Sequence, residues 1–516
     1  MTLRRIIASA AVAAAALCVA GASAFACTAF YVGKDVSSDG SVMLARTEDS
    51  KGASCKRFIV HPAADHGKGE LYTAPTGFSM EYPEHTFRYS AVPNSANEEE
   101  GEYPFGGGGF NEYGVAATST VSADPSEKAI AADPYEEAGL KEFFANDLIL
   151  SRVTTARAGV ELLARVIDEH GAGEGSIIMI ADEDEAWYME IYTGHQYAAM
   201  RLPDDKAAVV ANLFMLREFD PDSEDVIASK ELVSLPQEKG FLKQKNGRID
   251  LYETYAAPVN DYSSYRLWGG RKLLYGNPGT EPAKTEVSLL YSPTKKIALK
   301  DVMNAMRYRY EDTKYNLSAP GNKYIRAIGT ARQEECHVLQ IRPDLDRDIS
   351  CVQWLCLGNC EFEPFVPYYA SAITDTPYIA KLDAPLYSPD SMYWASRSLS
   401  TLAAKNRGLY GHKIKQFMSD YEDQLIKGLA DNDKAMSSTK EKNTLADKLC
   451  ADNAYAAYDM QRAVYNKLVT FLAEYEGEDE EKDNKLRFEL KIKQPAAAAA
   501  AYAELPYIVT LKEDAE

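Results

Sequence analysis

The first 26 residues decide where the folded chain can begin. Arg4 and Arg5 precede an apolar stretch at 6–20, and the triplet at 24–26 reads Ala-Phe-Ala. This order of basic, apolar and small residues is typical of a secretory signal peptide that is cleaved on export. We therefore predict that residues 1–26 are a signal peptide, that residue 27 opens the mature chain, and that the protein is secreted or periplasmic.

The rest of the chain has the composition of a large acidic globular protein. The full chain of 516 residues is 46% apolar and carries a formal net charge of -21. The apolar stretch of the leader is about 15 residues long, whereas a membrane-spanning helix needs roughly 20, and no later stretch is long and uncharged enough. We expect no stable membrane span, and so acidic a chain argues against nucleic acid as a partner. A homo-oligomer is left open.

The cysteine count points to position 27. The chain has eight cysteines, and Cys18 lies in the predicted leader, so seven remain after cleavage. An odd cysteine in an exported protein is either a free reactive thiol or an intermolecular partner. Cys27 is the natural odd one, and the other six are expected to be disulfide-bonded or inert buried thiols. Cys351, Cys356 and Cys360 lack the paired C-x-x-C spacing of a zinc site, so no metal is expected, and no cofactor.

Strand-like and helix-like runs predict an α+β fold. The runs 27–33 and 41–46 flank a turn signal at 37–40 and predict a β-hairpin. Apolar residues at helical spacing over 160–167, stopped by Gly171, predict an amphipathic helix. Helical texture from about residue 391 predicts a helical C-terminal part. Further strands are predicted at 177–180, 186–192, 197–202, 335–341 and 349–357.

Cleavage after residue 26 would leave Cys27 with a thiol and a free α-amine on one residue. The amine has a reference pKa of about 7.7 to 8.0 and the thiol one of about 8.5, so an unprotonated amine can take the thiol proton during attack. No separate histidine is then required. Two alternatives remain open: lipidation of Cys27, which would make the protein a membrane-anchored binding lipoprotein, and a disulfide at the mature terminus.

The predicted hairpin brings two charged residues back toward Cys27. A guanidinium from Arg46 near the thiol would favour the thiolate, and the carboxylate of Asp49 could hold and orient the α-ammonium. Residues three apart face opposite sides of a regular strand, so both can enter one site only if the strand ends or bulges near Thr47. The alternative is an ordinary surface ion pair.

A series of short motifs resembles the dipeptidase A-like family of cysteine N-terminal nucleophile (Ntn) hydrolases, over roughly residues 27–369. The motifs are Cys-Thr at 27–28, Val-Gly-Lys at 32–34, Ser-Asp-Gly-Ser at 38–41, Arg-Thr-Glu-Asp at 46–49, Phe-Asn-Glu-Tyr-Gly-Val-Ala at 110–116, Thr-Ala-Arg at 155–157, Glu-Ala-Trp-Tyr-Met-Glu at 185–190 and Ala-Asn-Leu-Phe at 211–214. Several motifs in one order are more specific than any single motif.

The resemblance implies a four-layer αββα sandwich of antiparallel sheets in a catalytic domain at 27–385, followed by a mainly helical region at 386–516. It also implies hydrolysis of dipeptides or another small amide substrate through a thioester on Cys27. In that pattern Arg46 and Asp49 position the thiol and the amine, and Asn212 helps to stabilise the oxyanion. The nearest alternative is an acylase-type amide hydrolase that resembles penicillin V or bile-salt acylases.

Two other polar residues are given structural interpretations or left undecided. Asn111 precedes Glu-Tyr-Gly and is as compatible with a turn as with a catalytic role, so it is left out of the site. His337 falls on a predicted strand, where a packed core histidine is more common than a catalyst. The glycines at 106–109 lack the lysine and hydroxyl residue of a phosphate-binding loop.

Overall fold

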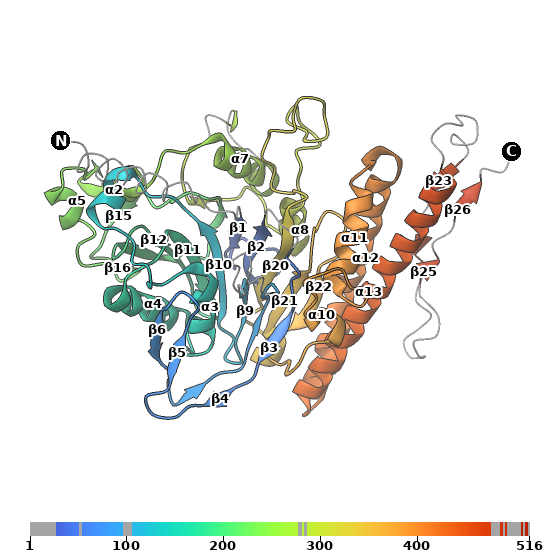
Figure 1. Ribbon diagram of the computed structural model, residues 1–516, viewed down its shortest axis with the longest axis horizontal. Coiled ribbons are helices and arrows are strands. Elements are labelled where there is room, and N and C mark those ends of the chain that lie inside the picture. The colour runs from blue at the N-terminus through green and yellow to red at the C-terminus, as the bar shows by residue number, and fades with distance from the viewer. Residues whose placement is uncertain are drawn as a thin grey trace, which may run out of the picture.

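The computed structural model describes most of the chain beyond the predicted leader (Figure 1). The described residues are 27–50, 54–95, 106–276, 281–282 and 286–475, with four short strands at 486–488, 491–492, 507–508 and 511–513. The predicted signal peptide at 1–26 lies outside them. Within this part of the chain, none of the helices has the length and apolar character that crossing a membrane requires.

A seven-stranded antiparallel sheet holds the N-terminal hairpin at its centre, in the order β19-β14-β1-β2-β20-β21-β22. The predicted hairpin is confirmed: β1 pairs with β2 with Ala29 opposite Arg46, and every residue of both strands is buried. Burial on both faces explains why these strands are not simple alternations of apolar and polar residues. The strands are β1 (Thr28–Val32), β2 (Val42–Asp49), β14 (Ala207–Val210), β19 (Leu290–Tyr291), β20 (Gln333–Ile341), β21 (Cys351–Cys356) and β22 (Val366–Tyr369).

A second, six-stranded sheet has the order β16-β13-β12-β11-β10-β9, and all its neighbouring strands are antiparallel. At its centre, β11, β12 and β13 form an antiparallel meander, which confirms the strands predicted at 177–180, 186–192 and 197–202. Strand β10 also contacts β1 and β2, so the two sheets meet near Cys27. The strands are β9 (Gly108–Phe110), β10 (Ala116–Ser122), β11 (Ser176–Ala181), β12 (Ala186–Ile191), β13 (Tyr197–Leu202) and β16 (Val226–Ala228).

Two helices pack on the six-stranded sheet. Helix α3 (Glu142–Leu150) contacts β10, and α4 (Ala156–His170) contacts β11 and β12. The predicted amphipathic helix is confirmed in α4, which begins after the capping side chain of Thr155 and ends at Gly171, where φ is 71°. A positive φ strains most residues, which explains why glycine stops this helix.

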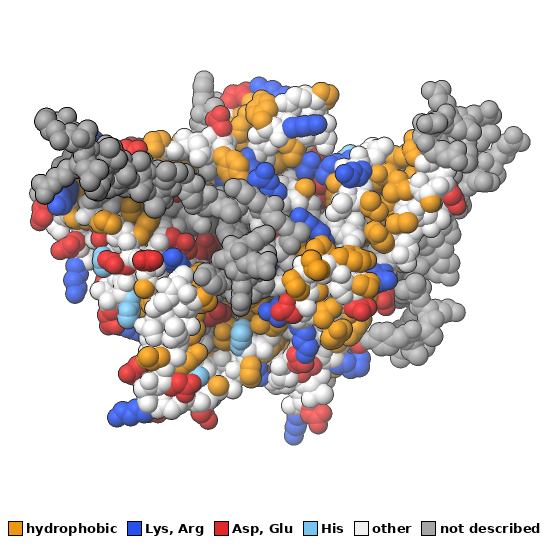
Figure 2. Space-filling view, in the orientation of Figure 1, with side chains coloured by type: hydrophobic (Ala, Val, Ile, Leu, Met, Phe, Trp, Pro, Cys, Tyr) orange, Lys and Arg blue, Asp and Glu red, His pale blue; other side chains and the backbone are white. Residues whose placement is uncertain are grey.

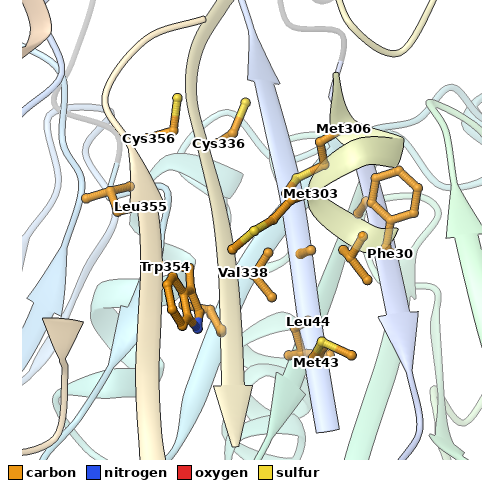
Figure 3. Close-up of a cluster of buried hydrophobic side chains, with 14 of the residues drawn as sticks. Phe30, Met43, Leu44, Met303, Met306, Cys336, Val338, Trp354, Leu355 and Cys356 are labelled. Carbon is orange, nitrogen blue, oxygen red and sulfur yellow. The ribbon is translucent and has the colours of Figure 1, made fainter. Parts of the chain in front are cut away.

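Two other helices pack on the seven-stranded sheet. Helix α7 (Asp261–Tyr275) contacts β14, and α8 (Leu299–Met306) contacts β2 and β20. Figure 3 shows Met303 and Met306 of α8 projecting toward the strands that carry Phe30 and Val338. These side chains are fully buried, so the centre of the seven-stranded sheet is part of a continuous apolar core.

Three long helices follow the sheets, as the sequence predicts from about residue 391. They are α11 (Met392–Ala403), α12 (His412–Ser438) and α13 (Lys442–Glu474). Both α12 and α13 contact β22 at the edge of the seven-stranded sheet, and α11 packs on α13 (Figure 1). The division into domains at residue 385 stays a prediction.

The remaining elements are short and connect the main ones. The helices are α2 (Glu127–Ala132), α5 (Ser234–Glu238), α6 (Leu251–Tyr255), α9 (Arg347–Ser350), α10 (Tyr378–Lys381) and the π-helix η3 (Arg407–Gly411). The strands are β3 (Ile59–His61), β4 (Ala64–Asp65), β5 (Leu71–Thr73), β6 (Ser79–Glu81), β7 (His85–Thr86), β8 (Tyr89–Ala91), β15 (Glu218–Phe219), β17 (Gln244–Lys245), β18 (Arg248–Asp250), β23 (Leu486–Phe488), β24 (Lys491–Ile492), β25 (Tyr507–Ile508) and β26 (Leu511–Glu513).

The predicted α+β class is confirmed at the level of antiparallel sheets packed with helices.

On the face that Figure 2 shows, basic side chains are interspersed with acidic ones rather than gathered into one basic area.

Candidate active site

Three neighbouring strands bring distant residues to one edge of the seven-stranded sheet. Cys27 directly precedes β1, and Thr28 pairs with Thr47 near the end of β2. On the other side of β1, Ala29 pairs with Val210 at the end of β14. Because both neighbours run antiparallel to β1, their C-terminal ends meet its N-terminal end. Asn212 and the end of β2 are therefore placed beside Cys27 by register alone.

Arg46 contacts the sulfur of Cys27. Its Nη2 lies 3.4 Å from Sγ and 3.1 Å from Oε2 of Glu48, while Nη1 lies 3.4 Å from Oε1 of Glu335. The side chain of Arg46 is fully buried. Burial lowers the pKa of this guanidinium, but Cys27, Glu48 and Glu335 outweigh burial and raise it. Arg46 therefore stays charged next to the thiol.

Burial, however, dominates the acidity of Cys27. The residue is 1% exposed, and burial raises the pKa of its thiol to about 12 although Arg46 lowers it. The sequence predicted that Arg46 would favour the thiolate, and its influence has that sign. It is nevertheless smaller than the cost of burying the negative charge. The thiol is therefore protonated at neutral pH.

A second set of buried groups holds Arg46 in place. Glu48 also pairs with Lys56, whose Nζ lies 2.5 Å from Oε1. Glu335 accepts from Nδ1 of His337 at 3.0 Å, and Nε2 of His337 lies 3.0 Å from Oγ1 of Thr118. His337 is thus a packed, fully hydrogen-bonded histidine, as its sequence context suggested. His337 therefore hydrogen-bonds Glu335, the acidic partner of Arg46, rather than the sulfur of Cys27.

The glycine run at 106–109 passes close to this network. The carbonyl of Gly107 accepts from Nη1 of Arg46 at 3.1 Å and from Nδ2 of Asn146 at 2.9 Å. Gly107 has a φ of 61°, and a Cβ at Gly108 would lie 2.9 Å from the ring of His337. Side chains at these positions would be strained or would clash, so the glycines allow the backbone to approach Arg46.

Asp49 reaches the same edge through a bulge. The pairing of β2 with β20 shifts register between Glu48 and Asp49, one residue beyond Thr47, where the sequence required the strand to end or bulge. Asp49 is 1% exposed and pairs with Arg326 through Oδ2. Burial raises its pKa, and Arg326 opposes that rise. The alternative of an ordinary surface ion pair is wrong, because Arg46 and Asp49 are both buried.

The second carboxylate oxygen of Asp49, Oδ1, lacks a donor within the described residues. It is also buried. A buried carboxylate oxygen without a donor is costly, so such an atom calls for an explanation.

Arg266, from α7, links Cys27 to Asn212. Its Nη1 donates to the backbone carbonyl of Cys27, and its Nη2 donates to Oδ1 of Asn212 at 2.8 Å. Burial and the nearby charge of Arg326 lower the pKa of Arg266 to about 10, so it remains cationic at neutral pH. By accepting from Arg266, the amide oxygen of Asn212 fixes which side of the amide carries the N–H donors.

The backbone that follows Asn212 is anchored by Glu190, from the Glu-Ala-Trp-Tyr-Met-Glu motif. Its carboxylate is buried and accepts from the backbone N–H of Met215 and, at 3.2 Å, from that of Leu216. It also accepts from the hydroxyls of Tyr188 and Tyr192 at 2.7 and 2.8 Å. The motif therefore holds the segment that carries Asn212.

Ser122, at the end of β10 in the six-stranded sheet, and Glu142, at the start of α3, complete the surroundings of Asn212. Nδ2 of Asn212 donates to the carbonyl of Ser122 at 2.9 Å, and the hydroxyl of Ser122 donates to Oε2 of Glu142 at 3.1 Å. Burial raises the pKa of Glu142 to about 7, although Arg46 lowers it. A second buried carboxyl group, besides Glu48, thus lies near Asn212.

The four residues predicted for the site, Cys27, Arg46, Asp49 and Asn212, are all brought to this edge. Sequence reasoning missed Arg266, Arg326 and Glu142, each of which comes from a segment far along the chain. Only the buried charge itself could have drawn attention to them, and burial is not visible in the sequence. Glu48 lay inside a quoted motif without receiving a role.

The surroundings of the remaining cysteines and of Asn111 indicate structural roles. All seven cysteines after the leader are buried and free within the described chain, so the disulfide alternatives are not observed. Asn111 accepts from the backbone N–H of Tyr113 and Val115 and donates to the carbonyls of Leu150 and Val153, which supports its interpretation as a turn residue. Among the described residues, no cluster of His, Cys, Asp and Glu could hold a metal ion.

Comparisons with known proteins give one consistent result. The family model for peptidase family C69 matches residues 26–420. A probable dipeptidase B of Streptococcus pyogenes serotype M1 is 33% identical over 469 residues, covering 86% of this chain and 93% of that protein. A probable dipeptidase B of Lactococcus lactis is 30% identical, covering 86% and 95%. A probable dipeptidase of Salmonella dublin is 33% identical over 352 residues, covering 67% and 81%.

Among solved structures, a variant of the conjugated bile acid hydrolase from Clostridium perfringens aligns with 64% of this chain and 89% of that chain. The two are 11% identical, and the TM-score is 0.31. A TM-score this low supports no conclusion about fold or activity.

Proposed function

Because the chain belongs to peptidase family C69, we propose that it is a cysteine dipeptidase that hydrolyses dipeptides with Cys27 as the nucleophile. The observation that carries this proposal is the contact of the Cys27 sulfur with Arg46, at the start of the central strand of a chain whose relatives are named dipeptidases. The substrate is a free dipeptide, and the residues that act on it are Cys27, Arg46, Asp49 and Asn212.

Removal of residues 1–26 creates the base. The freed α-amine of Cys27 takes the proton from Sγ while the sulfur attacks the carbonyl carbon of the dipeptide. Asp49 is suited to hold the resulting ammonium, because its buried Oδ1 otherwise has no donor within the described residues. A thiol whose pKa is about 12 requires this base, since little thiolate exists before attack.

Attack places a negative charge on the former carbonyl oxygen. The side-chain amide of Asn212 stabilises this oxyanion, and Arg266 holds the amide in place. Collapse of the tetrahedral intermediate breaks the C–N bond, and the leaving amine takes a proton from the α-ammonium of Cys27. The thioester that remains is hydrolysed by water, which gives its proton to the same amine and restores the thiol.

The fold supports a finer proposal as well. We infer a four-layer αββα Ntn-hydrolase sandwich, because helices α3 and α4 pack on one antiparallel sheet and α7 and α8 on the other, and the two sheets contact each other. The chemistry also requires cleavage after residue 26, so we infer that the enzyme is secreted or periplasmic. A Cys27-lipidated lipoprotein would lack the free amine and therefore the base.

The mature terminus is the first test. We expect intact-mass measurement and Edman sequencing of the exported protein to give an unmodified Cys27 as the first residue. A diacylglyceryl adduct on Cys27, or a terminus several residues away, would contradict both the mechanism and the proposed location.

The substrate class is tested by assaying a free dipeptide beside its N-acetyl derivative, penicillin V and a conjugated bile salt. We expect N-acetylation to reduce kcat/KM by at least about a hundredfold, because the groups that bind the α-ammonium are left unpaired. If the acetylated peptide or either acylase substrate is hydrolysed as well as the free dipeptide, the protein is an acylase rather than a dipeptidase.

A further inference from the structure

Glu142 is a buried acid without a cationic partner. The residue opens α3 and is 6% exposed. Its carboxylate accepts one hydrogen bond, from Ser122 at 3.1 Å, and it forms no ion pair with any described residue. The other buried acids at this edge differ, because Glu48, Glu335 and Asp49 are each paired with a cation.

Hydrogen bonds tie Glu142 to the reacting groups. Ser122 joins it to Asn212, because the hydroxyl of Ser122 donates to Glu142 and its carbonyl accepts from Asn212. Asn212 is joined through Arg266 to the carbonyl of Cys27. The charge of Glu142 also raises the pKa of the Cys27 thiol, in the same direction as burial.

Two hydrogen bonds of its backbone fix the position of Glu142. Its backbone N–H donates to Oε1 of Glu174 at 2.7 Å, and its carbonyl accepts from the hydroxyl of Ser119 at 3.3 Å. The charged groups that act on its carboxyl are Arg46, Glu174 and Glu48. Arg46 contacts Cys27, Glu48 and Glu335, so among the described residues the Glu142 carboxylate has no cation of its own when it is ionised.

We propose that Glu142 is a specificity-determining residue whose carboxylate binds the α-ammonium of the dipeptide substrate beside Cys27. The inference rests on the proposed dipeptidase function. In a dipeptide the α-ammonium is separated from the scissile carbonyl by one carbon atom, so the group that binds it must lie next to the nucleophile and the oxyanion site. A buried carboxylate without a cation supplies the attraction, and the substrate in turn supplies the missing counter-charge.

A structural role explains Glu142 less well. Its backbone groups already attach the start of α3 to Glu174 and Ser119, and these contacts do not need a charged side chain. A general-base role belongs to the α-amine, which is on the nucleophile itself. What remains for the carboxylate is recognition of a cation.

The test is the Glu142→Gln variant of the mature enzyme, assayed with a free dipeptide and with its des-amino analogue, in which hydrogen replaces the α-ammonium. We expect kcat/KM for the free dipeptide to fall about 100-fold, because the attraction to the ammonium is lost. The Glu142→Gln change should not alter turnover of the des-amino analogue. The wild type and the variant should hydrolyse it at the same rate, or neither should hydrolyse it detectably. Alkylation of Cys27 by iodoacetamide, which is neutral, should not slow.

Glu174→Gln is the matched control. It removes one negative charge nearby while its amide oxygen can still accept from the N–H of Glu142, and its kcat/KM for the free dipeptide should stay within about threefold of wild type. Glu142→Asp keeps the charge on a shorter side chain and should lie between Glu142→Gln and wild type. It also provides the measurement if the glutamine variant does not fold.

The outcomes separate the two proposals. A wild-type enzyme that cleaves no free dipeptide overturns the proposed function and the role of Glu142 together. An active wild type with full dipeptide activity in Glu142→Gln overturns the role of Glu142 alone. Slower alkylation of Cys27 in that variant, in parallel with lost dipeptide activity, would also overturn it by assigning Glu142 to the nucleophile.

Discussion

Two buried thiol environments of the seven-stranded sheet differ in the groups that surround their sulfurs, and the difference bears on the proposed role of Cys27. One is Cys27 at the start of β1. The other is the thiol cluster, defined as Cys336, Cys356 and Cys360, whose sulfurs interact with one another. Cys336 and Cys356 lie side by side on neighbouring strands (Figure 3). Burial raises the pKa of every one of these thiols.

The partners of the two environments differ. In the thiol cluster, Sγ of Cys356 lies 3.2 Å from Oε2 of Glu363, and Sγ of Cys360 lies 3.3 Å from Oε1 of Gln333. These oxygens accept from thiols and therefore favour the protonated form. Cys27 instead contacts the guanidinium of Arg46, and in the proposed mechanism it also carries its own amine. Both environments are buried, but within the described chain a cation contacts only the sulfur of Cys27, as the proposed nucleophile requires.

The largest expected effect on activity comes from removing the thiol of Cys27. Cys27→Ala should reduce dipeptide hydrolysis below detection while the protein remains folded, because the nucleophile and its proton are lost. Steady-state assays with circular dichroism as the folding control measure this. Activity retained in Cys27→Ala would end the proposed mechanism. A precursor that keeps residues 1–26 should be equally inactive, since an amide nitrogen at Cys27 is not basic.

The next effect concerns the oxyanion. Asn212→Ala should lower kcat by about 100- to 1,000-fold, the usual cost of removing one oxyanion donor. The thiol should keep its reactivity, so alkylation of Cys27 by iodoacetamide provides a control in the same preparation. A loss below tenfold would mean that another donor stabilises the oxyanion.

The pH dependence of kcat/KM tests the groups that are proposed to act at Cys27 and that the thiol cluster lacks. The α-amine, with a reference pKa of about 7.7 to 8.0, must be unprotonated, and Glu142, whose pKa is raised to about 7, must be ionised to bind the ammonium. Both conditions are met above these pKa values and lost as the pH falls through them. We expect log kcat/KM for a free dipeptide to fall with a slope near 2 toward pH 5.5, and near 1 in Glu142→Gln. A flat profile down to pH 5 would instead indicate a preformed thiolate.

The smallest effect is expected in the thiol cluster. Cys356→Ala should leave kcat/KM within about threefold of wild type and should lower the free energy of unfolding by about 1 to 3 kcal/mol, because a packed thiol and its hydrogen bond to Glu363 are lost. Denaturant unfolding measures the second quantity. A loss of activity as large as that of Cys27→Ala would show that the two environments are coupled in the reaction.

The sequence by itself determined the local elements and pointed to Cys27 as the candidate nucleophile. Turn signals, apolar periodicity and a helix-stopping glycine identified the hairpin, the meander and α4, because these depend on neighbours along the chain. Cys27 after a leader-like segment suggested a thiol that carries its own base, and a row of motifs led to Arg46, Asp49 and Asn212.

Only the tertiary structure decided how that site is completed. The register of β14 beside β1, the bulge before Asp49 and the approach of Arg266 from α7 depend on contacts between segments far apart in the sequence. The sequence predicted that a nearby guanidinium would favour the thiolate, but burial of Cys27 raises its pKa further than Arg46 lowers it. Desolvation depends on everything packed around a group, so no local pattern of residues could have revealed which influence is larger.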